Sequence, residues 1–193
     1  GSSGNGSATI ISTGSGDAMN NNITVAANSG GTLLMGAELT CEYGGNVTLN
    51  GDLSITSLYT GTGTNYVTFS GVISGVGGIT TLGPGKTVIT GTNIYAGETT
   101  VQSGMLIVTN SGNLGVSNVM VNPGGTLYIA NGTAIDDDAA VALNEDMGVY
   151  GRIDFSSGVN ETVDLLSIDG VAQHPGKYGA TGSGATYTND NHF

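Results

Sequence analysis

A chain of 193 residues, of which 38% are apolar, is long enough for one domain with its own hydrophobic core. Its 35 glycines do not indicate collagen, because they follow no three-residue period and only 3 prolines accompany them. A net charge of -12 with only 3 Lys and Arg residues argues against nucleic acid and anionic lipid as partners. No apolar run approaches the roughly 18 residues that span a bilayer, so we expect no membrane insertion.

Residues 1–12 begin with glycine and serine and are predicted to be a flexible segment with one β-prone stretch at 7–12. From residue 13 to 170, short stretches rich in Val, Ile, Leu and Thr are bounded by Gly, Asn or Pro, and the turns leave no room for helical crossovers. Residues 171–193 are predicted to be an irregular closing loop. The expected strands are residues 23–27, 31–35, 39–43, 47–49, 53–58, 79–82, 87–90, 99–103, 140–143, 149–155 and 163–168, with two more within 118–130.

Short motifs recur along these strands. The pentapeptide VTLNG at residues 47–51 returns as VTFSG at 67–71, an offset of 20 (67 minus 47), and VITG at 88–91 follows about one period on. A longer pair, VAANSGGTL at 25–33 and VMVNPGGTL at 119–127, lies 94 residues apart (119 minus 25). Repeats of this length indicate a solenoid. We therefore predict an all-β fold, a right-handed parallel β-helix of roughly nine rungs.

Residues 71–108 resemble the autotransporter-associated β-strand repeat, and residues 154–193 are similar to the segment that closes many such proteins. The resemblance implies a secreted bacterial passenger with a β-helical fold, located outside the cell or on its surface. It implies no enzymatic activity. The positions that match the repeat are Gly71, Ile73, Gly75, Gly78, Gly83, Gly85, Gly91, Asn93, Tyr95, Gly97, Thr99, Val101, Gly104 and Leu106.

The chain has a single cysteine, Cys41, which rules out an intrachain disulfide and gives no sign of the redox compartment. Cys41 alternates with polar neighbours and falls on the apolar face of its predicted strand, together with Leu39 and Tyr43. We expect a buried and chemically inert thiol.

The densest acidic cluster is Asp136-Asp137-Asp138. Its oxygens are ligands that Ca²⁺ favours, so Asp136 and Asp138 are the candidate metal residues. The spacing matches neither an EF-hand nor the nonapeptide of calcium β-rolls. A solvated turn is the competing interpretation.

Enzymes built on parallel β-helices would need paired carboxylates on one face or a basic residue beside a cation. Asp154, Asp164 and Asp169 are the acids that neighbouring rungs would align, with Arg152 or Lys177 as the cation. The chain has no Trp for sugar stacking, and His174 and His192 have no nearby second ligand. We therefore expect no catalytic residue and no cofactor.

The functional hypothesis concerns the two ends of the coil, since a solenoid exposes unpaired strand edges at its first and last rungs. The family's closing segment usually continues into a further strand, and the chain stops at Phe193, so we expect the last rung to lack one. The strand that contains Ala8, Thr9, Ile10 and Ile11 would complete that rung in the next copy, near Tyr187 and Phe193, and give a head-to-tail filament.

Three alternatives stay open from the sequence. The chain lacks an initiating Met, so it is either a mature product or a piece of a longer stalk whose continuation was not included. A passenger that binds surface glycans is the second functional interpretation. A polysaccharide-active enzyme is the third.

Overall fold

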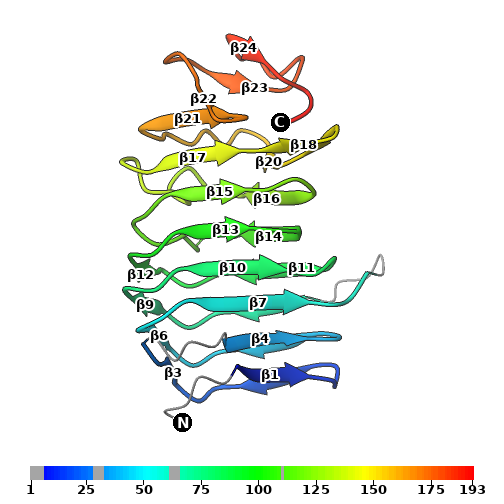
Figure 1. Cartoon of the computed structure of the whole chain (residues 1–193), viewed down its shortest axis with the longest axis vertical. Helices are drawn as coiled ribbons and strands as arrows, with labels where there is room; N and C mark the ends of the chain where they lie inside the picture. Colours follow the sequence, from blue (N-terminus) through cyan, green and yellow to red (C-terminus); the bar gives the residue numbers. More distant parts are fainter. Residues whose placement is uncertain (1–6, 28–32, 61–65, 110) are drawn as a thin grey trace.

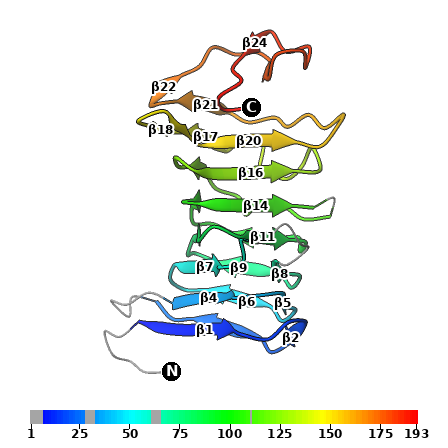
Figure 2. The same ribbon diagram turned by 90° about the vertical axis from the view of Figure 1, so that its right-hand side faces the viewer.

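The computed structural model describes residues 7–27, 33–60, 66–109 and 111–193, and these residues form strands and turns without any helix. Consequently no helix in the described chain is long and apolar enough to cross a membrane. Figures 1 and 2 show one coil in which successive strands rise from the N-terminal to the C-terminal end. This confirms the predicted parallel β-helix.

Three sheets make up the sides of the coil. The first sheet contains β1 (Ala8–Ser12), β4 (Leu33–Ala37), β7 (Leu53–Ser57), β10 (Ile79–Leu82), β13 (Thr99–Val101), β15 (Val119–Val121), β17 (Ala140–Leu143), β21 (Leu165–Ile168) and β22 (Val171–Ala172). The second sheet contains β2 (Asp17–Met19), β5 (Cys41–Tyr43), β8 (Val67–Phe69), β11 (Lys86–Ile89), β14 (Gly104–Val108), β16 (Gly125–Ile129) and β20 (Arg152–Phe155). The third sheet contains β3 (Ile23–Val25), β6 (Val47–Leu49), β9 (Ile73–Gly75) and β12 (Ile94–Tyr95).

The strands within each of these sheets pair in parallel, except that β21 and β22 are antiparallel. Outside them, β18 (Glu145–Asp146) and β19 (Val149–Tyr150) form a small antiparallel hairpin. Near the C-terminus, β23 (Tyr178–Gly179) pairs with β24 (Tyr187–Thr188). Parallel pairing between strands from successive rungs is what distinguishes a coil from a meander of hairpins.

The coil has about seven complete rungs, as the seven strands of the second sheet show, and the predicted nine is too many. The reason is that several rungs are longer than the assumed 20 residues. Leu53 pairs with Ile79, so that rung takes 26 residues (79 minus 53). Leu127 pairs with Ile153, and the β18–β19 hairpin lies within that 26-residue rung (153 minus 127).

The recurring sequence motifs predicted the fold, but they indicated the wrong side of the coil for some strands. Val47 lies in the third sheet and pairs with Ile73, whereas Val67 lies in the second sheet and pairs with Cys41. The shorter echo is correctly placed, since Phe69 pairs with Ile89. All three sides use the same alternation of apolar and small polar residues before a Gly or Asn turn, so a short motif identifies a strand but not its side.

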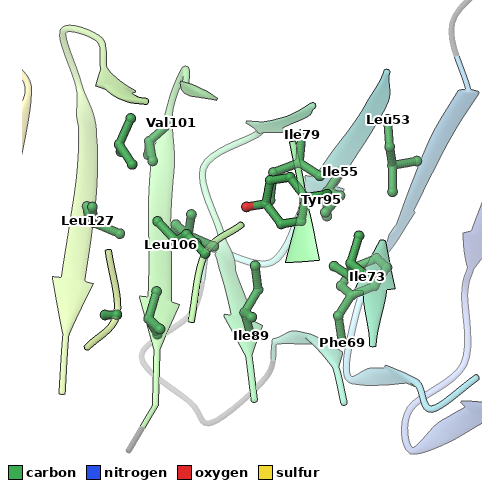
Figure 3. Close-up of a cluster of buried hydrophobic side chains, with 14 of the residues drawn as sticks. Leu53, Ile55, Phe69, Ile73, Ile79, Ile89, Tyr95, Val101, Leu106 and Leu127 are labelled. Atoms are coloured by element: carbon green, nitrogen blue, oxygen red, sulfur yellow. The ribbon is translucent and has the colours of Figure 1, made fainter. Parts of the chain in front are cut away.

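Inward side chains of the three sheets stack into one continuous apolar core, part of which Figure 3 shows. The rings of Tyr43 and Phe69, on neighbouring rungs of the second sheet, are stacked with centroids 4.9 Å apart. Cys41 is fully buried beside them, which confirms the expected burial of its thiol, and burial raises its pKa. Because each rung repeats this burial, the core is a column shared by all turns.

Amide side chains bind successive rungs together at the corners. Asn122 donates from Nδ2 to Oε1 of Gln102 at 2.8 Å, and Asn144 donates from Nδ2 to Oδ1 of Asn122 at 2.9 Å. A second amide ladder includes the fully buried Asn93, whose side chain bonds to the backbone on two neighbouring rungs. Such ladders satisfy polar groups that the tight corners would otherwise leave unpaired.

Two buried tyrosines make the stability of the coil sensitive to alkali. Burial raises the pKa of Tyr43 and of Tyr95 to about 12. Because unfolded phenols ionise near pH 10, stability should be unaffected by these groups below that pH and fall progressively from about 10 to 12. The fall should be smaller in Tyr95→Phe, as measured by urea unfolding at pH 9, 10 and 11. An equal fall in both proteins would contradict this prediction.

Candidate assembly surfaces and functional residues

The N-terminal end of the coil presents strands with one paired edge each. β1 is aligned with β4 over five register pairs, from Ala8 opposite Leu33 to Ser12 opposite Ala37. β1, β2 and β3 are terminal strands of their sheets, so among the described residues their outer edges have no strand partner. Of the predicted assembly residues on β1, Ala8 and Thr9 are exposed and Ile10 and Ile11 half-buried.

The alternation of β1 shows which of its backbone groups face outward. The carbonyl of Ser12 accepts a hydrogen bond from the amide of Glu38 at 2.9 Å, so Ser12 faces β4. In a parallel strand, successive residues direct their backbone groups to opposite neighbours. Thr9 and Ile11 therefore direct their amide and carbonyl groups to the open side.

The C-terminal end is covered. β22 pairs with the outer edge of β21, and on the second sheet the amide of Ile153 donates to the carbonyl of His192 at 2.8 Å. Phe193 packs against the apolar core. The interpretation that the last rung lacks a covering strand therefore does not describe this end of the chain. A donated strand would have to displace β22 or the segment around His192.

Arg152 fastens the closing segment to the last rung. Its guanidinium donates from Nη1 to the carbonyls of Asp190 and Asn191, at 3.0 and 3.1 Å, and from Nη2 to the carbonyl of Phe193 at 3.0 Å. It also lies 3.7 Å from Asp154. Asp190 in turn accepts hydrogen bonds from the amide and hydroxyl of Thr181, and these bonds lower its pKa. In the sequence, Arg152 stands out only as a possible cation of an active site, and this role was missed.

His192 and Tyr187 complete the closing segment. His192 is buried, with Nδ1 2.7 Å from the carbonyl of Gly151 and Nε2 3.8 Å from Asp169. Tyr187 is 40% exposed and stacks on Tyr178 with ring centroids 4.9 Å apart. The assembly role predicted for Tyr187 and Phe193 stays a prediction, and both residues lie in the closing segment that covers the last rung.

Replacing Arg152 with alanine should loosen the closing segment without unfolding the coil. The side chain is partly exposed, and its bonds to three carbonyls join two parts of the chain that are far apart in sequence. We expect amide exchange in residues 187–193 to become at least about tenfold faster, while β7 and β10 keep their protection. Lys177→Ala also removes one positive charge, from within the closing segment, and is the matched control. Equal exchange in the two variants would contradict this role of Arg152.

The acidic residues at 136–138 lie in a turn, in which Asp137 and Asp138 are exposed and Asp136 is half-buried. The amide of Asp138 donates to Oδ1 of Asp136 at 3.1 Å, and Glu161 supports the turn by accepting from the amide of Ala134 at 3.0 Å. Burial raises the pKa of Glu161. Across the described residues, no group of three or more His, Cys, Asp or Glu side chains is arranged to hold a metal ion. Calcium binding by Asp136 and Asp138 stays a prediction.

The acids considered for catalysis do not share a face. Asp154 lies on β20 in the second sheet, whereas Asp164 and Asp169 flank the two ends of β21 in the first sheet. Asp154 is near Arg152, and Asp169 is near His192. The alignment of these three acids across neighbouring rungs is therefore wrong, because the long rungs carry them to different sides.

Comparison with known proteins gives one informative similarity. Over 60 residues, 31% of the chain, the sequence is 48% identical to the adhesin BmaC autotransporter of Brucella suis biovar 1 (strain 1330). These residues span 2% of that protein's length. No family model matches the chain, and no solved structure matches it. The partial similarity to an autotransporter and the β-solenoid fold agree with the resemblance in its broad outline, and the autotransporter-associated repeat itself stays a prediction.

Proposed function

We propose that this chain is a β-helical structural module of a secreted bacterial passenger exposed at the cell surface, and that it associates with other copies through its first rung. The observation that carries the proposal is the contrast between the two ends. The edges of β1, β2 and β3 have no described strand partner, whereas β22 and the closing segment cover the last rung.

Two lines of support concern location and class. The similarity to an adhesin autotransporter supports a surface-exposed passenger, and the parallel solenoid suits a rod that extends from a surface.

The first rung suits strand addition. Thr9 and Ile11 present backbone donors and acceptors on an edge of five residues, and another strand can satisfy them. The head-to-tail arrangement needs the same edge to meet the last rung of the next copy, and the closing segment must then move aside. Pairing between two first rungs needs no such movement.

Thr9→Pro tests the open edge. Proline removes the outward amide of Thr9 and places its ring on that side, while the bonds of Ile10 and Ser12 to β4 are left in place. We expect this variant to stay monomeric in light scattering and electron microscopy at concentrations where the parent chain associates. Thr9→Val keeps the amide and is the matched control. Association that is equal in the parent and Thr9→Pro would reject the proposal.

A glycan-binding adhesin is the alternative, and the name of the similar protein favours it. That function predicts saturable binding of the isolated chain to glycan-coated surfaces. Binding that Thr9→Pro leaves unchanged, in a parent chain that stays monomeric, would replace the structural proposal with this one.

A further inference from the structure

Asp17 occupies an inward position at the N-terminal end of the coil, where Figure 2 shows β2 next to β5. The register of the second sheet places it in one column with Cys41, Val67, Thr87, Leu106, Leu127 and Ile153. These partners are at most 4% exposed, whereas Asp17 is exposed, since β2 has no described strand on its outer edge. Paired residues of neighbouring parallel strands point to the same face of a sheet, so the side chain of Asp17 is directed toward the interior of the coil.

The other inward positions of the first rung hold Ser12 and four apolar residues. These four are Ile10, Met19, Ile23 and Val25, each of which pairs with a buried core residue of the next rung. Ile10, Met19 and Ile23 are only half-buried, and they pack against the core. We call the four apolar residues together with Asp17 the core end. It is an apolar surface that contains one carboxylate.

The surroundings of Asp17 hold its carboxylate in place but do not neutralise it. The hydroxyl of Ser12 on β1 donates to Oδ2 of Asp17 at 2.5 Å. On β5, the buried thiol of Cys41 lies opposite Asp17, and Glu42 beside it is exposed on the outer face. The three Lys and Arg residues of the chain are at positions 86, 152 and 177, and Lys86 on β11 is three strands away from β2 in the sheet.

A carboxylate at this position opposes any contact that covers the core end. An ionised group that loses water without gaining a charged partner costs free energy, and proteins use inward-pointing charges to protect the edges of sheets. The hydrogen bond from Ser12 stays with the carboxylate and offsets part of this cost. The charge should therefore weaken a contact between the core end and a partner without forbidding it.

We propose that Asp17 limits the association of two copies through their first rungs, and that the apolar residues of the core end supply the contact. This inference rests on the proposed pairing of first rungs. Residues 13–16 join β1 to β2 within one rung, so a second copy that pairs with the edge of β1 also covers the core end. The contact then removes water from the carboxylate of each copy.

Asp17→Asn tests this role, because asparagine keeps the shape of the side chain and can accept the bond from Ser12 without carrying a charge. In sedimentation equilibrium at neutral pH, we expect a dissociation constant at least about tenfold lower than that of the parent chain. Asp17→Val, which repeats the Val67 of the same column, should associate at least as tightly. Glu42→Gln removes an equal charge from the outer face of β5 and is the matched control, with an expected change of about twofold or less.

Salt separates the role of Asp17 from the general repulsion between copies. The chain carries a net charge of -12, so about 0.5 M NaCl should strengthen the association of the parent and of every variant by screening that repulsion. The loss of water from a buried carboxylate is not relieved by screening. The roughly tenfold ratio between the parent and Asp17→Asn should therefore persist in salt.

The Thr9→Pro substitution distinguishes failure of this inference from failure of the proposed function. Added to Asp17→Asn, it should return the chain to a monomer. If Asp17→Asn and Glu42→Gln associate equally while Thr9→Pro still abolishes association, the first rungs pair and the role of Asp17 is wrong. If Thr9→Pro leaves the association of Asp17→Asn unchanged, or if no variant associates at any concentration, the pairing of first rungs is wrong and this inference is overturned with it.

Discussion

Asn93→Ala should lower the free energy of unfolding by about 3 kcal/mol or more, because three backbone groups lose their partner inside the coil. Asn93 is fully buried. Its Oδ1 accepts from the amide of Ile73 at 2.7 Å, and its Nδ2 donates to the carbonyls of Asn113 at 2.7 Å and Gly91 at 3.0 Å. Alanine cannot replace these bonds, and the corner is too tight for solvent to enter without disrupting the rungs.

Asn46→Ala is the matched control for this effect. The Oδ1 of Asn46 also accepts one backbone bond from the next rung, from the amide of Val72 at 3.1 Å, but at an exposed position. Water can satisfy that amide after the substitution, so we expect a loss of about 1 kcal/mol or less. Urea unfolding of the two variants measures the difference. Losses of equal size would show that the buried amide ladder does not hold the rungs together.

Removal of residues 171–193 should convert the chain into end-to-end fibres. The truncation takes away β22, which covers β21, and the segment whose carbonyls accept the bonds of Arg152 and Ile153. The last rung then exposes strand edges of the same kind as those of β1 and β2, and parallel stacking of one copy on the next continues the coil. Electron microscopy should show rods much longer than a single chain.

Adding Thr9→Pro to the truncated chain separates this effect from general aggregation. Rods that form by end pairing need the free edge of β1, so the double variant should not form them, whereas Thr9→Val should. Truncated chains that stay monomeric, or amorphous aggregates that form whether or not the proline is present, would show that the closing segment does not control assembly.

Many strands could be predicted because stretches rich in Val, Ile, Leu and Thr are bounded along the chain by turns of Gly, Asn or Pro. The expected 47–49, 79–82 and 140–143 coincide with β6, β10 and β17. The short strands β9 and β12 of the third sheet were missed as strands, since two or three residues between glycine and asparagine turns carry too little periodicity. The expected strand at 31–35 begins outside the described residues, and its described part belongs to β4.

The side of the coil on which each strand lies, and the roles of residues such as Arg152, depend on contacts between residues that are distant in sequence. Nothing near Arg152 in sequence indicates that it binds the carbonyls of residues 190, 191 and 193. The neighbours on the side of the coil formed by the third sheet are equally hidden, because Val76, Ala96 and Val116 become neighbours only once the lengths of the rungs are known. The sequence pattern does contain Gly91 and Asn93 of the resemblance. The structure explains Asn93 by the buried amide ladder, and Gly91 because a Cβ there would clash with the backbone carbonyl of Gly71.

Hydrogen exchange at two concentrations tests the open first rung most directly. The amides of Thr9 and Ile11 face the outer edge of β1, so they should exchange rapidly in dilute solution and slow at least about tenfold when the chain associates. The amides of β21, already covered by β22, should not change. Exchange at Thr9 and Ile11 that is independent of concentration while the chain associates would contradict the proposed pairing of first rungs.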